Sequence, residues 1–260
     1  MDLPDTYPGL GERIRNAVAQ LETESPTPDE LAGIDHFHTA GARATEGLAN
    51  FGKIAAQDRV LDVGAGLGGP ARWLMAHYRC EVVCVDLTEE FCEAARMLND
   101  LTGYQPEIVC GDILGLQLAD ESFDVAWAQN AFMNIEDKER LFTELNKVLK
   151  PGGRLVFQEL MAGPGDRPFA YPVPWASSAN QNFLVSPDKC RRVLERSGFI
   201  IRGWEDKNEW WHSLPPPPIG PGLADWVPDW GVKASNTGLN ADAKLIGLWW
   251  VVAVKPAIER

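Results

Sequence analysis

The chain has 260 residues, 45% of them hydrophobic and 23% charged, as expected for one globular domain with additions. Lys and Arg number 24 against 37 Asp and Glu, so the formal net charge is −13. Nucleic acids and anionic membrane surfaces attract clustered Lys and Arg, so this balance argues against both as partners. A neutral or cationic small molecule is compatible with it.

The five cysteines form no CxxC pair, and Cys84 and Cys110 lie within apolar, strand-like runs. We therefore expect buried free thiols, no disulfide framework and a cytoplasmic location. We expect no signal peptide in the opening MDLPDTYPGLGERIR, because it lacks a basic start followed by an apolar run. The longest apolar stretch, Leu245–Val254, is too short for a membrane span.

From residue 60 onward, strand-like and helix-like segments alternate along the chain. This order predicts an α/β fold with a mostly parallel sheet and helices on both faces. The strand-like runs lie at residues 60–63, 81–86, 107–110, 123–128, 154–160, 199–204 and 248–254.

Three segments lie outside this alternation. Residues 1–57 precede the first strand-like run and contain helical candidates at 10–21 and 40–51, so we expect a helical cap or lid before a domain at 58–260. Two insertions are expected, at about 161–185 and 206–241. The second contains the proline run 215–218 and the tryptophans Trp210, Trp211, Trp226 and Trp230, which would anchor the insertion or contact a second copy in a homodimer.

A glycine-rich loop follows the first strand-like run, in the sequence VLDVGAGLGG. Gly64, Gly66 and Gly69 fit the spacing G-x-G-x-x-G, in which missing side chains let a ligand approach the backbone. Asp86 ends the next strand-like run, where a carboxylate can accept hydrogen bonds from both hydroxyls of a ribose. The pattern predicts an adenosine-containing ligand, either a nicotinamide dinucleotide or S-adenosylmethionine.

Three details favour S-adenosylmethionine. Asp62 lies two residues before Gly64, where it would repel a pyrophosphate but suit an ammonium and a sulfonium. Asp112 follows the third strand-like run and can accept a hydrogen bond from an adenine amine. The chain also lacks a second mononucleotide-binding half with a large catalytic domain.

Five successive motifs resemble those of class I S-adenosylmethionine-dependent methyltransferases, over roughly residues 55–205. They are DVGAGLGG, the acid in VCVDL, CGDI, FDVAWAQNAFMNI and LKPGGRL. The resemblance implies a Rossmann-like seven-stranded sheet in the order 3-2-1-4-5-7-6, with strand 7 antiparallel.

A narrower resemblance is to the sarcosine/dimethylglycine methyltransferases and related small-molecule enzymes. It is carried by DHFHTAGARAT, VDLTEEFCEAA, QNAFMNIEDKERL and YPVPWA, whereas residues 206–241 match no pattern of that group. It implies in-line methyl transfer to a small amine of the sarcosine or dimethylglycine type. O- or C-methylation of a secondary metabolite, a nicotinamide-dependent oxidoreductase and a non-catalytic subunit that binds an adenosine ligand are the alternatives.

The resemblance also implies roles for individual residues. The loop from Gly64 through Ala65 and Gly66 would contact the methionine part of the cofactor, and Arg43 would pair with its carboxylate. The other cofactor-binding candidates are Asp62, Asp86 for the ribose, Leu87, Asp112 and Ile113 for the adenine, and Gln129 for the amino-acid end.

The candidates for binding the methyl acceptor are Met133, Asn134, Tyr171 and Trp175. His36 and His38 form an HxH pair that could supply a general base or a hydrogen bond that caps the cofactor or the sheet. No third ligand is evident near this pair, so we expect no metal.

Overall fold

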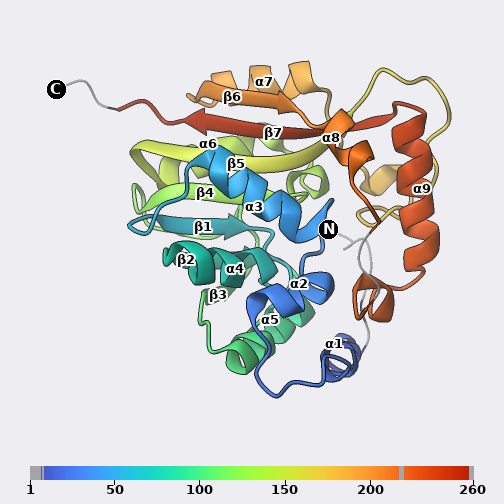
Figure 1. Ribbon diagram of the computed structural model, residues 1–260. Helices are drawn as coiled ribbons and strands as arrows, with labels where there is room; N and C mark the ends of the chain where they lie inside the picture. The colour runs from blue at the N-terminus through green and yellow to red at the C-terminus, as the bar shows by residue number, and fades with distance from the viewer. Residues whose placement is uncertain (1–6, 8, 217–219, 258–260) are drawn as a thin grey trace.

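The computed structural model describes residues 7, 9–216 and 220–257. Its seven strands form one sheet in the order β3-β2-β1-β4-β5-β7-β6 (Figure 1). Strand β7 runs antiparallel to β5 and β6, and the other neighbours are parallel. The predicted Rossmann-like fold and strand order are therefore confirmed. Pro217 and Pro218 of the proline run lie outside the described residues.

The strands lie close to the predicted runs. They are β1 (Arg59–Val63), β2 (Glu81–Asp86), β3 (Glu107–Cys110), β4 (Phe123–Gln129), β5 (Leu149–Ala162), β6 (Ile200–Asp206) and β7 (Ile246–Val254). Strand β5 begins earlier than predicted, because Leu149 already pairs with Phe123 before a register shift. Gly152 and Gly153, which precede the predicted run at 154–160, lie inside β5.

The helices form two layers around the sheet. They are α1 (Leu10–Ala19), α2 (Pro28–Asp35), α3 (Gly41–Gly52), α4 (Gly69–Tyr78), α5 (Glu89–Thr102), α6 (Lys138–Val148), α7 (Pro187–Arg196), α8 (Asn208–Ser213) and α9 (Trp230–Asp242). Helices α3 and α4 contribute to a core on one face, and α6 and α7 to the core on the other. Within the described residues, no helix is long and apolar enough to cross a membrane.

The cysteine prediction holds for Cys84 but is wrong for Cys110. Both are free thiols, and Cys84 is buried within β2, which has a neighbouring strand on each side. Cys110 is exposed because it ends β3, the edge strand of the sheet.

The insertion at 206–241 is anchored by one of its tryptophans. Trp226 is 1% exposed, and its Nε1 donates a hydrogen bond of 2.8 Å to the carbonyl oxygen of Ile34 in α2. Its ring lies 5.1 Å from Phe37 and 6.1 Å from Phe91, between centroids. The anchoring role therefore applies to Trp226, and it places the insertion against the N-terminal helices, beside the arrowheads of the parallel strands (Figure 1).

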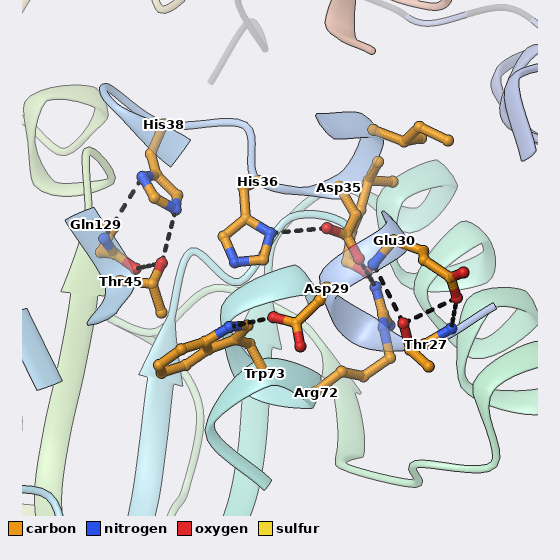
Figure 2. A network of polar contacts seen from close by, with 12 residues as sticks. Thr27, Asp29, Glu30, Asp35, His36, His38, Thr45, Arg72, Trp73 and Gln129 are labelled. Carbon is orange, nitrogen blue, oxygen red and sulfur yellow. Dashed lines mark hydrogen bonds and ion pairs between the residues drawn. The ribbon is translucent and has the colours of Figure 1, made fainter. Parts of the chain in front are cut away.

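A buried ion pair fixes the N-terminal helices to the sheet domain (Figure 2). Asp35, at the end of α2, accepts a hydrogen bond of 2.9 Å from Nη2 of Arg72 in α4, and both side chains are fully buried. The other carboxylate oxygen of Asp35 lies 2.7 Å from Nδ1 of His36. Arg72 also donates from Nη1 to Asn99 at 2.8 Å, so the pair joins three helices.

Replacing Arg72 with Met should lower the free energy of unfolding by about 3–5 kcal/mol, because the carboxylate of Asp35 would remain buried without its partner. Denaturant titration measures this change. The double variant Asp35→Asn/Arg72→Met should lose less than the sum of the two single variants. Additive losses would contradict a coupled ion pair.

Candidate functional site

A cavity of about 410 Å³ lies at the carboxyl ends of the central strands. It brings together most of the residues predicted from sequence, although they come from six separate segments of the chain. The predicted residues in its wall are His38, Asp62, Gly64, Ala65, Gly66, Asp86, Leu87, Asp112, Ile113, Gln129, Met133, Asn134 and Trp175.

The glycine loop forms one wall of the cavity, and two glycines have different reasons to be there. Gly64 (φ 70°) packs so closely on Ala131 that an added Cβ would lie 2.4 Å from the Cβ of Ala131. Gly66 (φ 53°) faces open space, so its missing side chain leaves room for a ligand. Both have a positive φ, which favours glycine over other residues.

Asp86 is held in place by backbone donors at the end of β2. Its Oδ2 accepts a hydrogen bond of 2.7 Å from the amide of Gly66, and its Oδ1 accepts one of 2.9 Å from the amide of Thr88. Burial raises the pKa of Asp86, while these hydrogen bonds oppose the shift. Because a carboxylate has about four acceptor sites, both oxygens can still accept from a ligand.

Asp62 is a buried carboxylate with an unused oxygen. The residue is 2% exposed, lines the cavity, and its Oδ2 has no hydrogen-bond partner among the described residues. Burial, and then the nearby Asp86, raise the pKa of Asp62 to about 8. A cationic donor in the cavity would satisfy this oxygen and favour its ionised form.

The rim of the cavity near β3 combines a carboxylate with apolar side chains. Asp112 is exposed, and its Oδ1 accepts a hydrogen bond of 2.9 Å from the amide of Leu114. Leu87 is 43% exposed on the adjoining loop, and Ile113 is buried. This rim offers apolar surface next to an acceptor, a combination that suits a flat heterocycle carrying an amine.

His38 belongs to a hydrogen-bonded group at the end of β4 (Figure 2). Its Nε2 lies 3.2 Å from Oγ1 of Thr45, which donates a hydrogen bond of 3.0 Å to Oε1 of Gln129. Its Nδ1 lies 3.4 Å from Nε2 of Gln129. Burial, and then the proximity of His36, lower the pKa of His38 to about 3, so its ring is neutral at pH 7.

Three predicted residues are not among those that line the cavity: His36, Arg43 and Tyr171. His36 is buried against Asp35, and Arg43 is exposed on α3. The hydroxyl of Tyr171 accepts a hydrogen bond of 2.9 Å from Asn182, whose Oδ1 in turn accepts one of 3.0 Å from Nε1 of Trp175. Tyr171 thus lies behind Trp175 in the wall.

The sequence reasoning missed Asn130, which also lines the cavity. Its Oδ1 accepts hydrogen bonds from the amide of Thr39 at 2.8 Å and from Nε2 of Gln158 at 3.0 Å. These two donors fix the side-chain amide, so that its buried Nδ2 is left without a partner in the described structure. The sequence signal for Asn130 is its position in the polar pair Gln129-Asn130, which follows the apolar run FDVAWA. Only Gln129 of this pair is among the predicted residues.

A second missed feature supports the wall from behind. Oε2 of Glu159, a buried residue, accepts a hydrogen bond of 2.8 Å from the amide of Phe132, in the short 3₁₀ helix η1 (Phe132–Asn134). Nζ of Lys138 donates to the carbonyl oxygens of Phe183, at 2.9 Å, and Ile135. Burial raises the pKa of Glu159 and lowers that of Lys138. Glu159 and Lys138 thus hold the backbone of η1 and the carbonyl groups of Ile135 and Phe183, which belong to this wall.

No group of three or more His, Cys, Asp or Glu side chains within residues 7, 9–216 and 220–257 is arranged to hold a metal ion.

Comparison with known proteins identifies relatives of this chain. Residues 61–157 match the family model described as "Methyltransferase domain". The chain is 32% identical over 174 residues to the glycine/sarcosine/dimethylglycine N-methyltransferase of Actinopolyspora halophila, covering 66% of this chain and 31% of that protein. It is 31% identical over 179 residues to the sarcosine/dimethylglycine N-methyltransferase of Halorhodospira halochloris, covering 68% and 63%. The matched region thus spans less than two thirds of either relative.

A solved structure with the same fold is Haemonchus contortus phosphoethanolamine N-methyltransferase 2 in complex with S-adenosyl-L-methionine. The match has a TM-score of 0.67 at 18% identity and covers 94% of this chain and 57% of the other. The predicted resemblance to class I methyltransferases and to the sarcosine/dimethylglycine group is therefore confirmed.

The raised pKa of Asp62 predicts a pH-dependent stability. Between about pH 4 and pH 8, Asp62 keeps its proton in the folded chain but releases it in the unfolded chain. The free energy of unfolding therefore falls by about 1.4 kcal/mol for each unit by which pH rises in this range. Asp62→Asn cannot ionise, so its free energy of unfolding should rise relative to that of the unmodified chain between pH 5 and pH 7.5. Denaturant titration at both pH values tests this. Asp112→Asn, at an exposed position, is the control. If the free energies of unfolding of Asp62→Asn and the unmodified chain differ by the same amount at both pH values, the raised pKa of Asp62 is contradicted.

Proposed function

Since the chain carries a methyltransferase domain over residues 61–157, we propose that it transfers a methyl group from S-adenosylmethionine to the nitrogen of a small amine. One observation carries the proposal: Asp62 lines the same cavity as the glycine loop and Asp86, and it has a buried carboxylate oxygen without a partner among the described residues. The amine nitrogen is the reactive group of the substrates named in the two relatives.

The cavity wall fits the chemical groups of S-adenosylmethionine, which supplies an activated methyl group on a sulfonium. Asp62 would accept hydrogen bonds from the ammonium, and Gly64, Ala65 and Gly66 would lie along the methionine part. Asp86 would accept from the ribose hydroxyls. Leu87, Asp112 and Ile113 would bind the adenine.

The carboxylate end of the cofactor would be held near Gln129. Asn130 has an unpaired, buried Nδ2 beside it, which makes this amide a further donor to that carboxylate. Arg43, which the sequence suggested for this role, is exposed on α3. Its role stays a prediction, and to reach the cofactor either α3 or the Arg43 side chain would have to move.

Positioning and exclusion of water do most of the work in the proposed reaction, because the sulfonium is already activated. The acceptor nitrogen must approach the methyl group in line with sulfur, and η1 and Trp175 provide the wall that would orient it. His38 is a positioning residue here. Its lowered pKa makes it a poor proton acceptor but a stable neutral partner for Gln129 and Thr45.

The alternatives fit the cavity less well. The pyrophosphate of a nicotinamide dinucleotide would approach the carboxylate of Asp62, which carries no cationic partner among the described residues. O- or C-methylation would use the same cofactor site and differs only in the acceptor. A non-catalytic subunit would bind the cofactor without turnover, so an activity screen separates it.

The remaining predictions on organisation stay part of the proposal. We assign residues 1–57 to a cap and 58–260 to the catalytic domain, with a cytoplasmic location. The ion pair between Asp35 and Arg72 supports a cap that is fixed at α2, so that lid motion would be confined to segments on either side of that helix. A homodimer is a prediction for sedimentation analysis.

Replacing Asp86 with Ala should weaken binding of S-adenosylhomocysteine by about tenfold or more, because the ribose would lose its acceptors. Isothermal calorimetry measures the affinity, and titration with NAD tests the dinucleotide alternative. Asp100→Ala removes an exposed carboxylate outside the cavity and serves as the matched control. Unchanged affinity in a folded Asp86 variant would remove this residue from the site.

Replacing Trp175 with Ala should lower kcat/KM for the amine by about tenfold while the affinity for S-adenosylhomocysteine stays nearly constant, because an aromatic wall stabilises the cation that forms on transfer. Trp175→Phe keeps a ring but removes the hydrogen bond to Asn182, and should retain most activity. Kinetics with a labelled methyl donor provide the test. Equal losses in both variants would mean that the hydrogen bond, and not the ring, is what matters.

A further inference from the structure

The cavity is divided by charge. Its charged side chains among the described residues are four carboxylates, Asp35, Asp62, Asp86 and Asp112. Asp35 is neutralised by Arg72, and Asp62, Asp86 and Asp112 belong to the half proposed for the cofactor.

The other half of the cavity is formed entirely by uncharged side chains. Its apolar members are Met133, Ile135, Pro174, Trp175 and Phe183. Its polar members are the amides Asn134, Asn180 and Gln181. These residues come from η1, the residue that follows it, and the insertion at 161–185.

The hydrogen-bonding groups in this half differ in whether they already have a partner. Oδ1 of Asn134 is a buried acceptor without a partner in the described structure. Nε1 of Trp175 is already used by Asn182, so the indole presents a ring and not a free donor. Oε1 of Gln181 accepts from the amide of Ser177 at 3.0 Å, which holds that amide at the edge of the wall.

Among the lining residues that the structure describes, none offers a guanidinium or ammonium to a carboxylate or phosphate on the acceptor, and Nζ of Lys138 is already engaged by the carbonyl oxygens of Ile135 and Phe183. An amine with an N–H group, carried on an apolar body, meets the wall better. Its N–H can be donated to Asn134, its body can pack on Met133 and Phe183, and the cation that forms on transfer can face Trp175.

We infer that the methyl acceptor is an amine with an N–H group on an apolar body and carries no anionic group. This inference rests on the proposed N-methyl transfer and narrows it. It separates the site from one built for an amino-acid acceptor, in which the substrate's carboxylate needs its own cationic partner.

A matched pair of acceptors tests the charge rule. N-methylphenethylamine and N-methylphenylalanine differ only by the carboxylate, and sarcosine and dimethylglycine extend the comparison. We expect kcat/KM to be at least about tenfold higher for N-methylphenethylamine than for any carboxylated amine, and calorimetry with S-adenosylhomocysteine present should give the same order of affinity. Equal or better use of a carboxylated amine would overturn the inference and leave N-methyl transfer standing. If every amine is inert while a phenol or carbon acid is methylated, the proposed function fails as well.

A variant tests the role of Asn134. Asn134→Leu should lower kcat/KM for N-methylphenethylamine by about tenfold, because its N–H loses its acceptor, and should leave N,N-dimethylphenethylamine, which has no N–H when neutral, nearly unchanged. Asn134→Gln keeps an uncharged acceptor oxygen and should retain activity on the secondary amine. Asn16→Leu, on the exposed side of α1, is the matched control. Thermal midpoints and S-adenosylhomocysteine affinity establish that each variant is folded, and equal loss for both amines would contradict the hydrogen bond.

Discussion

The buried ion pair between Asp35 and Arg72 is the interaction on which the site depends. It is costly to desolvate two charges, and such a pair is stable only with good geometry and further hydrogen bonds, which Asn99 and His36 supply here. The pair sets the end of α2 against the beginning of α4, where Gly69 leaves no room for a side chain beside Asp35. The segment that follows, including His38, therefore enters the cavity from a fixed point.

A second set of hydrogen bonds connects the segment that follows α2 to the strands at the centre of the sheet. Gln158 in β5 donates to the carbonyl oxygen of Thr39 at 2.9 Å and accepts from Nε1 of Trp250 in β7 at 2.9 Å. Asn130 accepts from the amide of Thr39, so the cap segment is bound to the ends of two strands. Since the amide of Gln158, the backbone of Thr39 and Oδ1 of Asn130 are all paired, the network specifies one placement of the cap, and a small shift would break several of these hydrogen bonds.

The sequence predicts the sheet, the glycine loop and the acids at the ends of β1, β2 and β3, because these features are local. An apolar run, a turn that needs positive φ and a carboxylate at a strand end are all visible within about ten residues. The pairing of Asp35 with Arg72 is not visible, since the two residues are distant in sequence and a charged residue within a helix usually indicates an exposed face. Arg43, predicted from the resemblance and from the fit of a guanidinium to a carboxylate, is exposed on α3, and its role stays a prediction.

The contrast between the two halves of the cavity has a physical reason in the proposed chemistry. A sulfonium loses its charge as the methyl group leaves, while the acceptor nitrogen gains one, so positive charge moves from the acidic half toward the neutral half. Carboxylates beside the acceptor would stabilise a protonated amine, which has no lone pair and cannot react. A neutral wall with an aromatic ring avoids that ground-state trap and still favours the cation as it develops. The uncharged wall between η1 and Trp175 is thus consistent with a site that binds the acceptor in its reactive, neutral form.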